Sequence, residues 1–346
     1  MKKIIDVSGF GHSGKTAISD YLKSYPSVFG FPNYVEFELF RVPNGLIDLY
    51  FNLYESWNLI RSRVRVNEFK KLSHRIGRVQ KRSDPFSYFL ASGHGYNQYF
   101  NNKFIEISDA FVEKLILKTQ KNTFWPYQNL LVSPINLFLN KFKTKFFNKL
   151  VSADLIYTDR NAFLEIVHEY LQLLFHEATN EQHTHILLNN AFDPFYPTPC
   201  LDMIGEGYSI IVDRDPRDIY ASQIKPEDIY IPVYEQTKTA NQIRQSFTGF
   251  NDIEYFIFRY KTLQKNIRHK EDKRILRIKY EDFVLKHQQF APIVTNFVGL
   301  DNSNHSEKGV FDLEVSKKNI GIWKKYDHIP EIQQIEKELA AYCYTE

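Results

Sequence analysis

Cysteine, methionine and tryptophan are scarce in this chain of 346 residues, which contains two, two and three of them. Cys200 and Cys343 are too few and too far apart for a disulfide framework or a cysteine zinc site, so we expect a reducing compartment. No uninterrupted apolar run reaches about 18 residues, so no transmembrane helix is expected. A strand is predicted from residue 4, which leaves no room for a signal peptide before it. These absences predict a cytoplasmic protein.

A large excess of one charge is also absent, since the net charge is +3, and basic character is therefore local. Residues 61–82 hold nine lysines and arginines against Glu68 alone, and seven lysines between Lys114 and Ala153 meet no acidic residue. Residues 41–160 have long helical and aromatic patterns, which predict a helical insertion. It either binds an anionic polymer or rests on a membrane surface, or it is a solvated basic face over an aromatic core. No RNA- or DNA-binding module is recognised, so we expect no nucleic-acid partner.

Glycine is concentrated where the chain begins. Residues 9–16, Gly-Phe-Gly-His-Ser-Gly-Lys-Thr, match G-x-x-x-x-G-K-[ST] in full, after an apolar strand at 4–7 and before a helical pattern at 17–22. Glycines let backbone N–H groups converge on an anion, the helix N-terminus adds positive potential, and lysine supplies a mobile charge. An ordinary glycine-rich turn between strand and helix is the alternative. We predict that a phosphate-like group binds here, at Gly11, His12, Ser13, Gly14, Lys15, Thr16 and Ala17.

The remaining pattern alternates strands with helices. Strands are expected at 34–40, 185–188, 209–212 and 275–278, and helices at 161–177, from 216, at 255–267, 290–298 and 329–342. This alternation implies a parallel sheet covered on both faces. We therefore predict one α/β domain over 1–346, a three-layer fold with a central parallel sheet, into which the helical segment 41–160 is inserted.

The strand predicted over 34–40 carries two acidic residues. Val35, Phe37 and Leu39 lie on one face of the alternation, and Glu36 and Glu38 lie on the other. Two carboxylates beside a phosphate loop are candidates for acid–base chemistry. A solvated strand face is an equally good explanation.

A second informative segment, Ile210 to Ser222, admits two interpretations. In one, Asp213 ends a Walker B strand and holds Mg²⁺. In the other, Arg214 is an anion ligand at the strand end, and Ser222 lies two turns into the next helix. A strand-end turn followed by a helix directs both side chains to one place above the sheet.

At this segment the sequence resembles the sulfotransferase family, whose donor is 3′-phosphoadenosine 5′-phosphosulfate (PAPS). Residues 214–222 match the family pattern R-[DN]-P-x-D-x-x-x-S, residues 276–283 its late strand and Y-E-D turn, residues 297–300 its F-x-G-L helix end, and residues 316–324 its R-K-G-x-x-G-x-W-K loop. The resemblance covers about 1–40 and 185–345. It implies a P-loop NTPase-like sulfotransferase fold, PAPS as donor, 3′-phosphoadenosine 5′-phosphate (PAP) as product, and no metal. It also implies that Arg214 and Ser222 clamp the 3′-phosphate and that Ser316, Lys317 and Lys318 lie in the loop over the nucleotide.

The sequence departs from the family pattern in two loops. His12 stands where the first loop of the family has lysine, and Lys15 stands where it has threonine. In the last loop, Ser316 and Lys318 replace an arginine and a glycine, and a lysine adopts a left-handed backbone much less easily than glycine. Lys317 and Lys318 are candidates to restore the missing charge.

Sulfuryl transfer is expected to follow the logic of in-line phosphoryl transfer. We assign the charge on the bridging oxygen to Lys15, with His12 as second choice. The base for an acceptor hydroxyl is Glu36, which fits the E-x-x-x-F context of glycan-acting family members, with Glu38 second. The expected acceptor is a carbohydrate or a lipid-linked glycan bound by the insertion, and peripheral contact with a membrane stays open. An ATP/Mg²⁺-dependent small-molecule kinase and a non-enzymatic polyanion-binding protein are the alternatives.

Overall fold

The computed structural model describes residues 2–33, 35–80, 94–120, 133–147, 153–224, 252–267, 271–301, 305 and 311–345. The chain divides into two compact units, one formed by Met1–Phe40 and Ala178–Glu346 and the other by Arg41–Glu177. The second unit corresponds to the predicted insertion, extended to include the helix expected at 161–177. That residues 1–346 form one domain stays a prediction.

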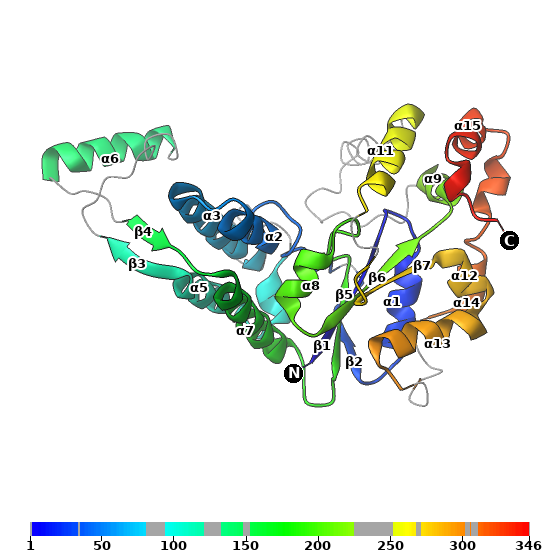
Figure 1. Ribbon diagram of the computed structural model, residues 1–346, viewed down its shortest axis with the longest axis horizontal. Helices are drawn as coiled ribbons and strands as arrows, with labels where there is room; N and C mark the ends of the chain where they lie inside the picture. Colours follow the sequence, from blue (N-terminus) through cyan, green and yellow to red (C-terminus); the bar gives the residue numbers. More distant parts are fainter. Residues whose placement is uncertain are drawn as a thin grey trace. The chain divides into compact units, whose positions relative to one another are not determined.

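A parallel sheet of five strands in the order β2-β5-β1-β6-β7 is the centre of the first unit (Figure 1). Its strands are β1 Lys3–Gly9, β2 Val28–Gly30, β5 His185–Asn189, β6 Gly207–Asp213 and β7 Ile275–Lys279. β1, β5 and β6 are almost continuously buried, as expected for parallel strands covered on both faces. The predicted α/β fold with a central parallel sheet is confirmed.

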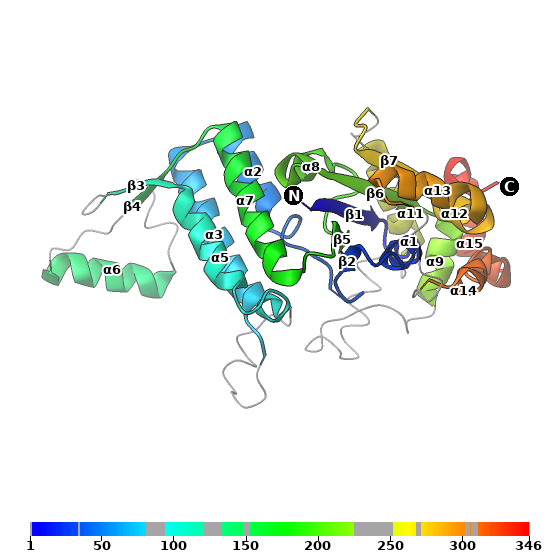
Figure 2. The same cartoon turned by 90° about the horizontal axis from the view of Figure 1, so that it is seen from below.

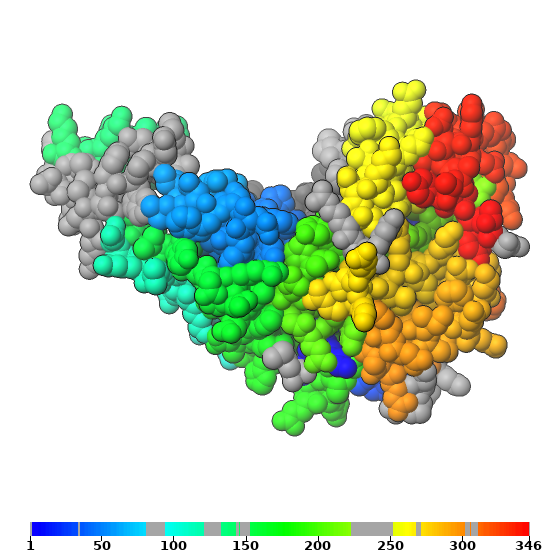
Figure 3. Space-filling view, in the orientation of Figure 1, coloured from blue at the N-terminus to red at the C-terminus, as the bar shows by residue number. Residues whose placement is uncertain are grey.

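Helices cover the sheet in two groups, each with its own core. The helices are α1 Lys15–Lys23, α8 Thr198–Ile204, α9 Pro216–Ile224, α11 Ile253–Lys265, α12 Tyr280–Leu285, α13 His287–Val298, α14 Leu313–Lys317 and α15 Pro330–Glu338, with short 3₁₀ turns at Ile322–Tyr326 and Ala340–Tyr342. Residues of α1, α12 and α13 share one core with Ile5, Val7 and Val212 of the sheet. Residues of α9, α11 and α15 share another around Phe10. In Figure 3, α11 (yellow) and the C-terminal segment (red) lie side by side on the surface.

The strand predicted over 34–40 is wrong for residues 35–40, and Tyr34 lies outside the described residues. β2, at Val28–Gly30, takes the edge position beside β5 instead. After it the backbone bonds locally: the Val35 N–H donates to the Pro32 carbonyl (2.8 Å) and the Glu38 N–H to the Glu36 carbonyl (2.9 Å). The alternation reflects burial of apolar side chains in an irregular segment, where Val35, Phe37 and Leu39 are buried without a ladder.

The second unit is mainly helical. Its elements are α2 Leu46–Tyr50, the π-helical turn η1 Phe51–Glu55, α3 Leu59–Gly77, the 3₁₀ turn Tyr96–Tyr99, α5 Phe104–Lys114, β3 Ile116–Gln120, α6 Pro134–Phe147, β4 Ala153–Ile156 and α7 Arg160–Ala178. Figure 2 shows α3, α5 and α7 side by side. Their core is aromatic, with Phe111 stacked on Tyr170 at 4.4 Å between ring centroids and Phe69 edge-on to Phe111. The antiparallel pair β3–β4 has no counterpart in the predicted insertion.

The basic segments are only partly described. Lys81 and Arg82 of the first, and residues 121–132 and 148–152 of the second, lie outside the described residues. Among the described helices, none combines the length and apolar character needed to cross a bilayer.

Candidate active site

The loop at residues 9–16 leaves β1 and enters α1, in the strand–turn–helix order that the motif requires. Gly14, with φ of 81°, and His12, with φ of 62°, have left-handed backbones. The Ser13 N–H donates to the Phe10 carbonyl (3.0 Å), which closes the turn. Lys15 is the first residue of α1 and is half-buried, whereas Gly11 and Thr16 are exposed. Alternation of left- and right-handed residues at a helix N-terminus forms a concave, amide-lined anion site.

Tyr280 supports this loop from the sheet side. A Cβ added at Gly14 would overlap the Tyr280 ring, with 2.7 Å to Cε2. The phenol donates to the Ser316 carbonyl at 2.8 Å, and burial raises the pKa of Tyr280. The tyrosine of the Y-E-D segment therefore joins the phosphate loop to the C-terminal segment.

Arg214 brings three distant segments together from the end of β6. Its Nη1 donates to the His12 carbonyl (2.9 Å) and to Ser222 Oγ (3.2 Å), and Nη2 donates to the Asn319 carbonyl. The side chain is buried, and Nε has no partner among the described residues. Because a guanidinium has five N–H donors, two of them stay available for an anion. Arg214 and Ser222 are thus in contact, as the motif predicts, and both adjoin the phosphate loop.

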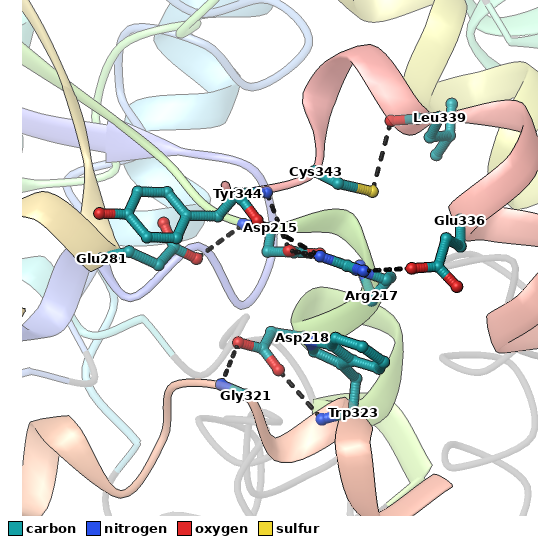
Figure 4. Close-up of polar contacts among 10 residues, drawn as sticks. All are labelled: Asp215, Arg217, Asp218, Glu281, Gly321, Trp323, Glu336, Leu339, Cys343 and Tyr344. Atoms are coloured by element: carbon teal, nitrogen blue, oxygen red, sulfur yellow. Dashed lines mark hydrogen bonds and ion pairs between the residues drawn. The ribbon is translucent and has the colours of Figure 1, made fainter. Parts of the chain in front are cut away.

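The charged residues that follow Arg214 hold α9 in place (Figure 4). Asp215 caps the helix, since its Oδ1 accepts the Arg217 N–H at 2.8 Å. The Arg217 guanidinium pairs with Asp215 and Glu336, both at 2.7 Å, and lies 4.0 Å from the Trp323 ring centroid. The Tyr344 N–H also donates to Asp215 (2.9 Å). These contacts are structural and direct no charge into the site.

Asp218 fastens the C-terminal loop to α9. Its carboxylate accepts the N–H groups of Gly321 (2.8 Å) and Trp323 (3.1 Å), and burial raises its pKa (Figure 4). Gly321 has φ of 69°, a left-handed backbone that favours glycine. Because Asp218 holds this loop, the Asn319 carbonyl lies where it accepts a hydrogen bond from Arg214.

The three predicted residues of that loop have different surroundings. Ser316 is buried, and its Oγ donates to the Asp312 carbonyl at 2.9 Å. Lys317 pairs with Glu314 at 2.7 Å, and Lys318 is exposed. Lys318 is right-handed helical, with φ of −64° and ψ of −16°, so the left-handed strain considered from the sequence does not arise.

Glu281 is a residue of this region that was not among the candidates predicted from the sequence. It is almost fully buried, and its Oε1 accepts the Asp215 N–H at 2.8 Å, while Oε2 has no partner among the described residues. Burial raises the pKa of Glu281 to about 7, with the neighbouring Asp215 charge contributing. Its second position in Y-E-D was the available signal, but its partner lies 66 residues away.

A hydrogen bond from Asn190 holds Glu36 at the edge of the sheet where the parallel strands end. The Asn190 side chain donates to Glu36 Oε2 at 2.8 Å, and its backbone N–H donates to the Val7 carbonyl at 2.9 Å. Asn190 follows β5 with φ of 51°. Glu36 is therefore tied to the end of β1, from which the phosphate loop departs. Glu38 is half-buried two residues further along.

Asp213, the alternative magnesium ligand, is engaged elsewhere. It forms an ion pair with Arg277, whose Nη2 lies 2.8 Å from Asp213 Oδ1 and also donates to Gln264. Among the described residues, no cluster of three histidine, cysteine or acidic side chains has a metal-binding arrangement.

The residues present fit an anionic group at the phosphate loop. Two buried polar atoms flank the loop without a partner among the described residues: Ser13 Oγ and Arg214 Nε. The space beside Gly11 is open, since an added Cβ would have no atom within 4 Å. Buried polar atoms without partners are rare, and a bound water or ion is one explanation for them.

No protein-family model and no curated protein sequence matches this chain. Among solved structures, it is similar to a sulfotransferase domain from the curacin biosynthetic pathway, with 14% identity, a TM-score of 0.39 and coverage of 98% of both chains. The sulfotransferase domain of the Synechococcus olefin synthase gives 13% identity and a TM-score of 0.39, over 100% of this chain and 95% of that one. A retinol dehydratase in complex with retinol and PAP gives 12% identity and a TM-score of 0.34, over 98% of this chain and 80% of that one. The solved structures similar to this chain thus include sulfotransferases, the family that its motifs resemble.

Proposed function

We propose that this protein is a sulfotransferase that moves a sulfuryl group from PAPS to an acceptor hydroxyl. The observation that carries the proposal is the Arg214 guanidinium, which is hydrogen-bonded to both the phosphate loop and Ser222. A second anion ligand next to the loop is what a donor with a 3′-phosphate and a 5′-phosphosulfate requires. A nucleoside triphosphate has no 3′-phosphate for such a ligand.

In this proposal the backbone amides of Gly11 to Ala17 hold the 5′ end of the donor, with Ser13 Oγ as a further hydrogen-bonding group. Arg214 and Ser222 hold the 3′-phosphate, and the loop with Ser316, Lys317 and Lys318 lies over the nucleotide. Lys15, at the N-terminus of α1, stabilises the charge that develops on the bridging oxygen, with His12 as second candidate. Fixed amides and one cation serve a sulfuryl group, which carries less charge than a terminal phosphoryl, without a metal.

The base is Glu36, held at the sheet edge by Asn190. It accepts the proton of the acceptor hydroxyl while the new S–O bond forms and the S–O bond to the 5′-phosphate breaks. Glu38 is the second candidate. For the acceptor we propose a hydroxyl of a carbohydrate or lipid-linked glycan, supported by the E-x-x-x-F context of Glu36. The helical unit supplies basic residues for its binding, including Arg61, Lys71 and Arg75, which are exposed on α3. Since both cysteines are free and buried, we propose a reducing, cytoplasmic location.

An ATP-dependent small-molecule kinase is the second candidate, favoured by the complete Lys15-Thr16 pair of the loop. Such a kinase needs a carboxylate for Mg²⁺, and the pairing of Asp213 with Arg277 argues against Asp213 in that role.

Calorimetry with PAP and with ATP–Mg²⁺ separates the two. We expect tighter binding of PAP, weakened about 10- to 100-fold by Arg214→Ala, because a charge-assisted hydrogen bond contributes about 1.5–3 kcal/mol. Tighter ATP binding that Arg214→Ala leaves unchanged would overturn the proposal.

Transfer of radiolabelled sulfate from PAPS to a panel of glycans, nucleotide sugars, lipids and phenols then identifies the acceptor class. On the best acceptor, Glu36→Gln should lower kcat by about 100-fold or more at unchanged PAP affinity, and Glu38→Gln, measured beside it, tests the second candidate. Full activity of Glu36→Gln removes Glu36 as the base.

A further inference from the structure

Helix α6, Pro134–Phe147, lies on an excursion between the two strands of the β3–β4 pair. Gln120 of β3 pairs with Ala153 of β4, so all residues between them leave and return at one end of this ribbon. The helix is therefore part of the connection between the two strands of an antiparallel ribbon.

The exposed face of α6 is apolar. Ile135, Phe138, Leu139 and Phe142 are 74%, 69%, 43% and 45% exposed. Their spacing of i, i+3, i+4 and i+7 gathers them on an arc of about 100° at 3.6 residues per turn. Exposing four large apolar side chains in one stripe is unfavourable in water and marks an interaction surface.

The charge around this stripe has one sign. Lys141 and Lys145 of α6 are exposed, and on a helical projection both lie at the edge of the stripe next to Phe138. The helix contains no acidic residue, and neither does the whole stretch between Lys114 and Ala153, which has seven lysines. The complementary partner is therefore an apolar layer with negative charge at its surface.

We propose that α6 binds flat on an anionic lipid bilayer. The apolar stripe enters the boundary between headgroups and acyl chains, and Lys141 and Lys145 contact lipid phosphates, as in interfacial amphipathic helices. With 14 residues the helix is about 21 Å long, shorter than the hydrocarbon core, so it rests on the membrane and does not cross it.

A second copy of the chain fits this surface less well. In a two-fold symmetric contact, α6 would face α6, and two acid-free, lysine-bearing segments would meet. Like charges across such an interface are unfavourable, whereas a bilayer with anionic lipids satisfies both the apolar stripe and the lysines.

The test is flotation of the full chain with phosphatidylcholine vesicles that contain or lack phosphatidylglycerol. We expect binding only to vesicles with phosphatidylglycerol, lost in high salt. The double variant Phe138→Ser/Leu139→Ser should weaken binding by at least about tenfold, and Lys141→Gln/Lys145→Gln by about tenfold or more. Phe258→Ser on α11, where the side chain is 65% exposed, is the matched control and should bind like the unaltered protein.

A labelled variant reports the geometry directly. Because both native cysteines are buried, Asn136→Cys on the exposed α6 provides a selective site for an environment-sensitive fluorophore. Its emission should shift to the blue with anionic vesicles. Equal binding of neutral vesicles, unchanged binding of the α6 variants, or an α6-dependent dimer without vesicle binding would overturn the proposal.

Circular dichroism shows whether each variant is folded. The inference does not rest on the proposed sulfotransferase activity. Vesicle binding by a protein that binds no PAP would refute only the proposed function.

Discussion

Gly14→Ala provides the sharpest test of how the phosphate loop is built. The substitution adds a Cβ where Gly14 has φ of 81° and where the Tyr280 ring leaves no room. A left-handed backbone costs an L-residue about 1–2 kcal/mol, and overpacking a close contact costs about 1–3 kcal/mol. Reduced freedom of the unfolded chain offsets about 0.4–1 kcal/mol of this. We therefore expect a net loss of about 1–5 kcal/mol in the free energy of unfolding.

Gly11→Ala is the matched control in the same loop. An added Cβ at Gly11 has no atom within 4 Å, and its φ lies outside the left-handed region. Its free energy of unfolding should change by less than about 1 kcal/mol. Urea denaturation followed by circular dichroism measures both variants. Equal effects at Gly11 and Gly14 would refute this account of the loop.

A double-mutant cycle separates the two terms at Gly14. Tyr280→Ala removes the ring, so in that background Gly14→Ala should retain only the backbone term of about 1–2 kcal/mol. The coupling energy between the sites is then about 1–3 kcal/mol. Additive effects would show that the ring does not limit this position.

Three further outcomes are expected. The pKa of Glu281 in the folded protein is about 7, above its ordinary value of 4.5, so the unfolded chain releases this proton first as the pH rises. The free energy of unfolding should therefore fall by up to about 3 kcal/mol between about pH 4.5 and 7. Urea denaturation at several pH values should show that Glu281→Gln lacks this part of the pH dependence. Asp218→Asn puts an amide donor opposite the Gly321 or Trp323 N–H and should weaken PAP binding about tenfold in calorimetry, whereas an effect on kcat alone would contradict its bracing role. Burial raises the pKa of Cys200 well above its ordinary value and that of Cys343 to about 11, so both thiols should react with Ellman's reagent only after denaturation.

The predictable parts of the fold are those that a short stretch of sequence determines by itself. The phosphate loop is one such stretch, because glycine positions and a following helix determine its backbone. The strands at 185–188, 209–212 and 275–278 were also found, since buried parallel strands appear as apolar runs. The helix expected from residue 216 was found as well, since proline is typical of the first helical position.

Features that depend on distant partners were not predictable. The alternation at 34–40 predicts a strand, but the edge beside β5 is taken by Val28–Gly30, a choice that only the assembled sheet decides. The β3–β4 pair joins residues that are separated by the segment containing α6, and no short sequence pattern predicts such a pairing. The motif gives the position of Lys318 in the last loop but not its backbone angles. Whether Lys318 has a left-handed backbone could therefore be decided only from the structure.

In the candidate site, the sequence predicted one contact of Arg214 but not the others. Spacing predicted that Arg214 and Ser222 would meet, and their hydrogen bond agrees with it. It did not predict that Arg214 would also brace the His12 and Asn319 carbonyls. A single side chain therefore holds the two loops and also keeps donors for an anion.

Residues outside the proposed anion site hold the segments that form it. Tyr280 links Gly14 to Ser316, and Asp218 holds the loop that carries Asn319 to Arg214. Because Tyr280 and Arg214 are buried, moving one of their partners leaves a buried polar group unsatisfied, which costs about 1–3 kcal/mol. Substitutions at Tyr280 or Asp218 should therefore change donor affinity and stability together. Substitutions at Glu36, which lies outside this chain of contacts, should change turnover alone.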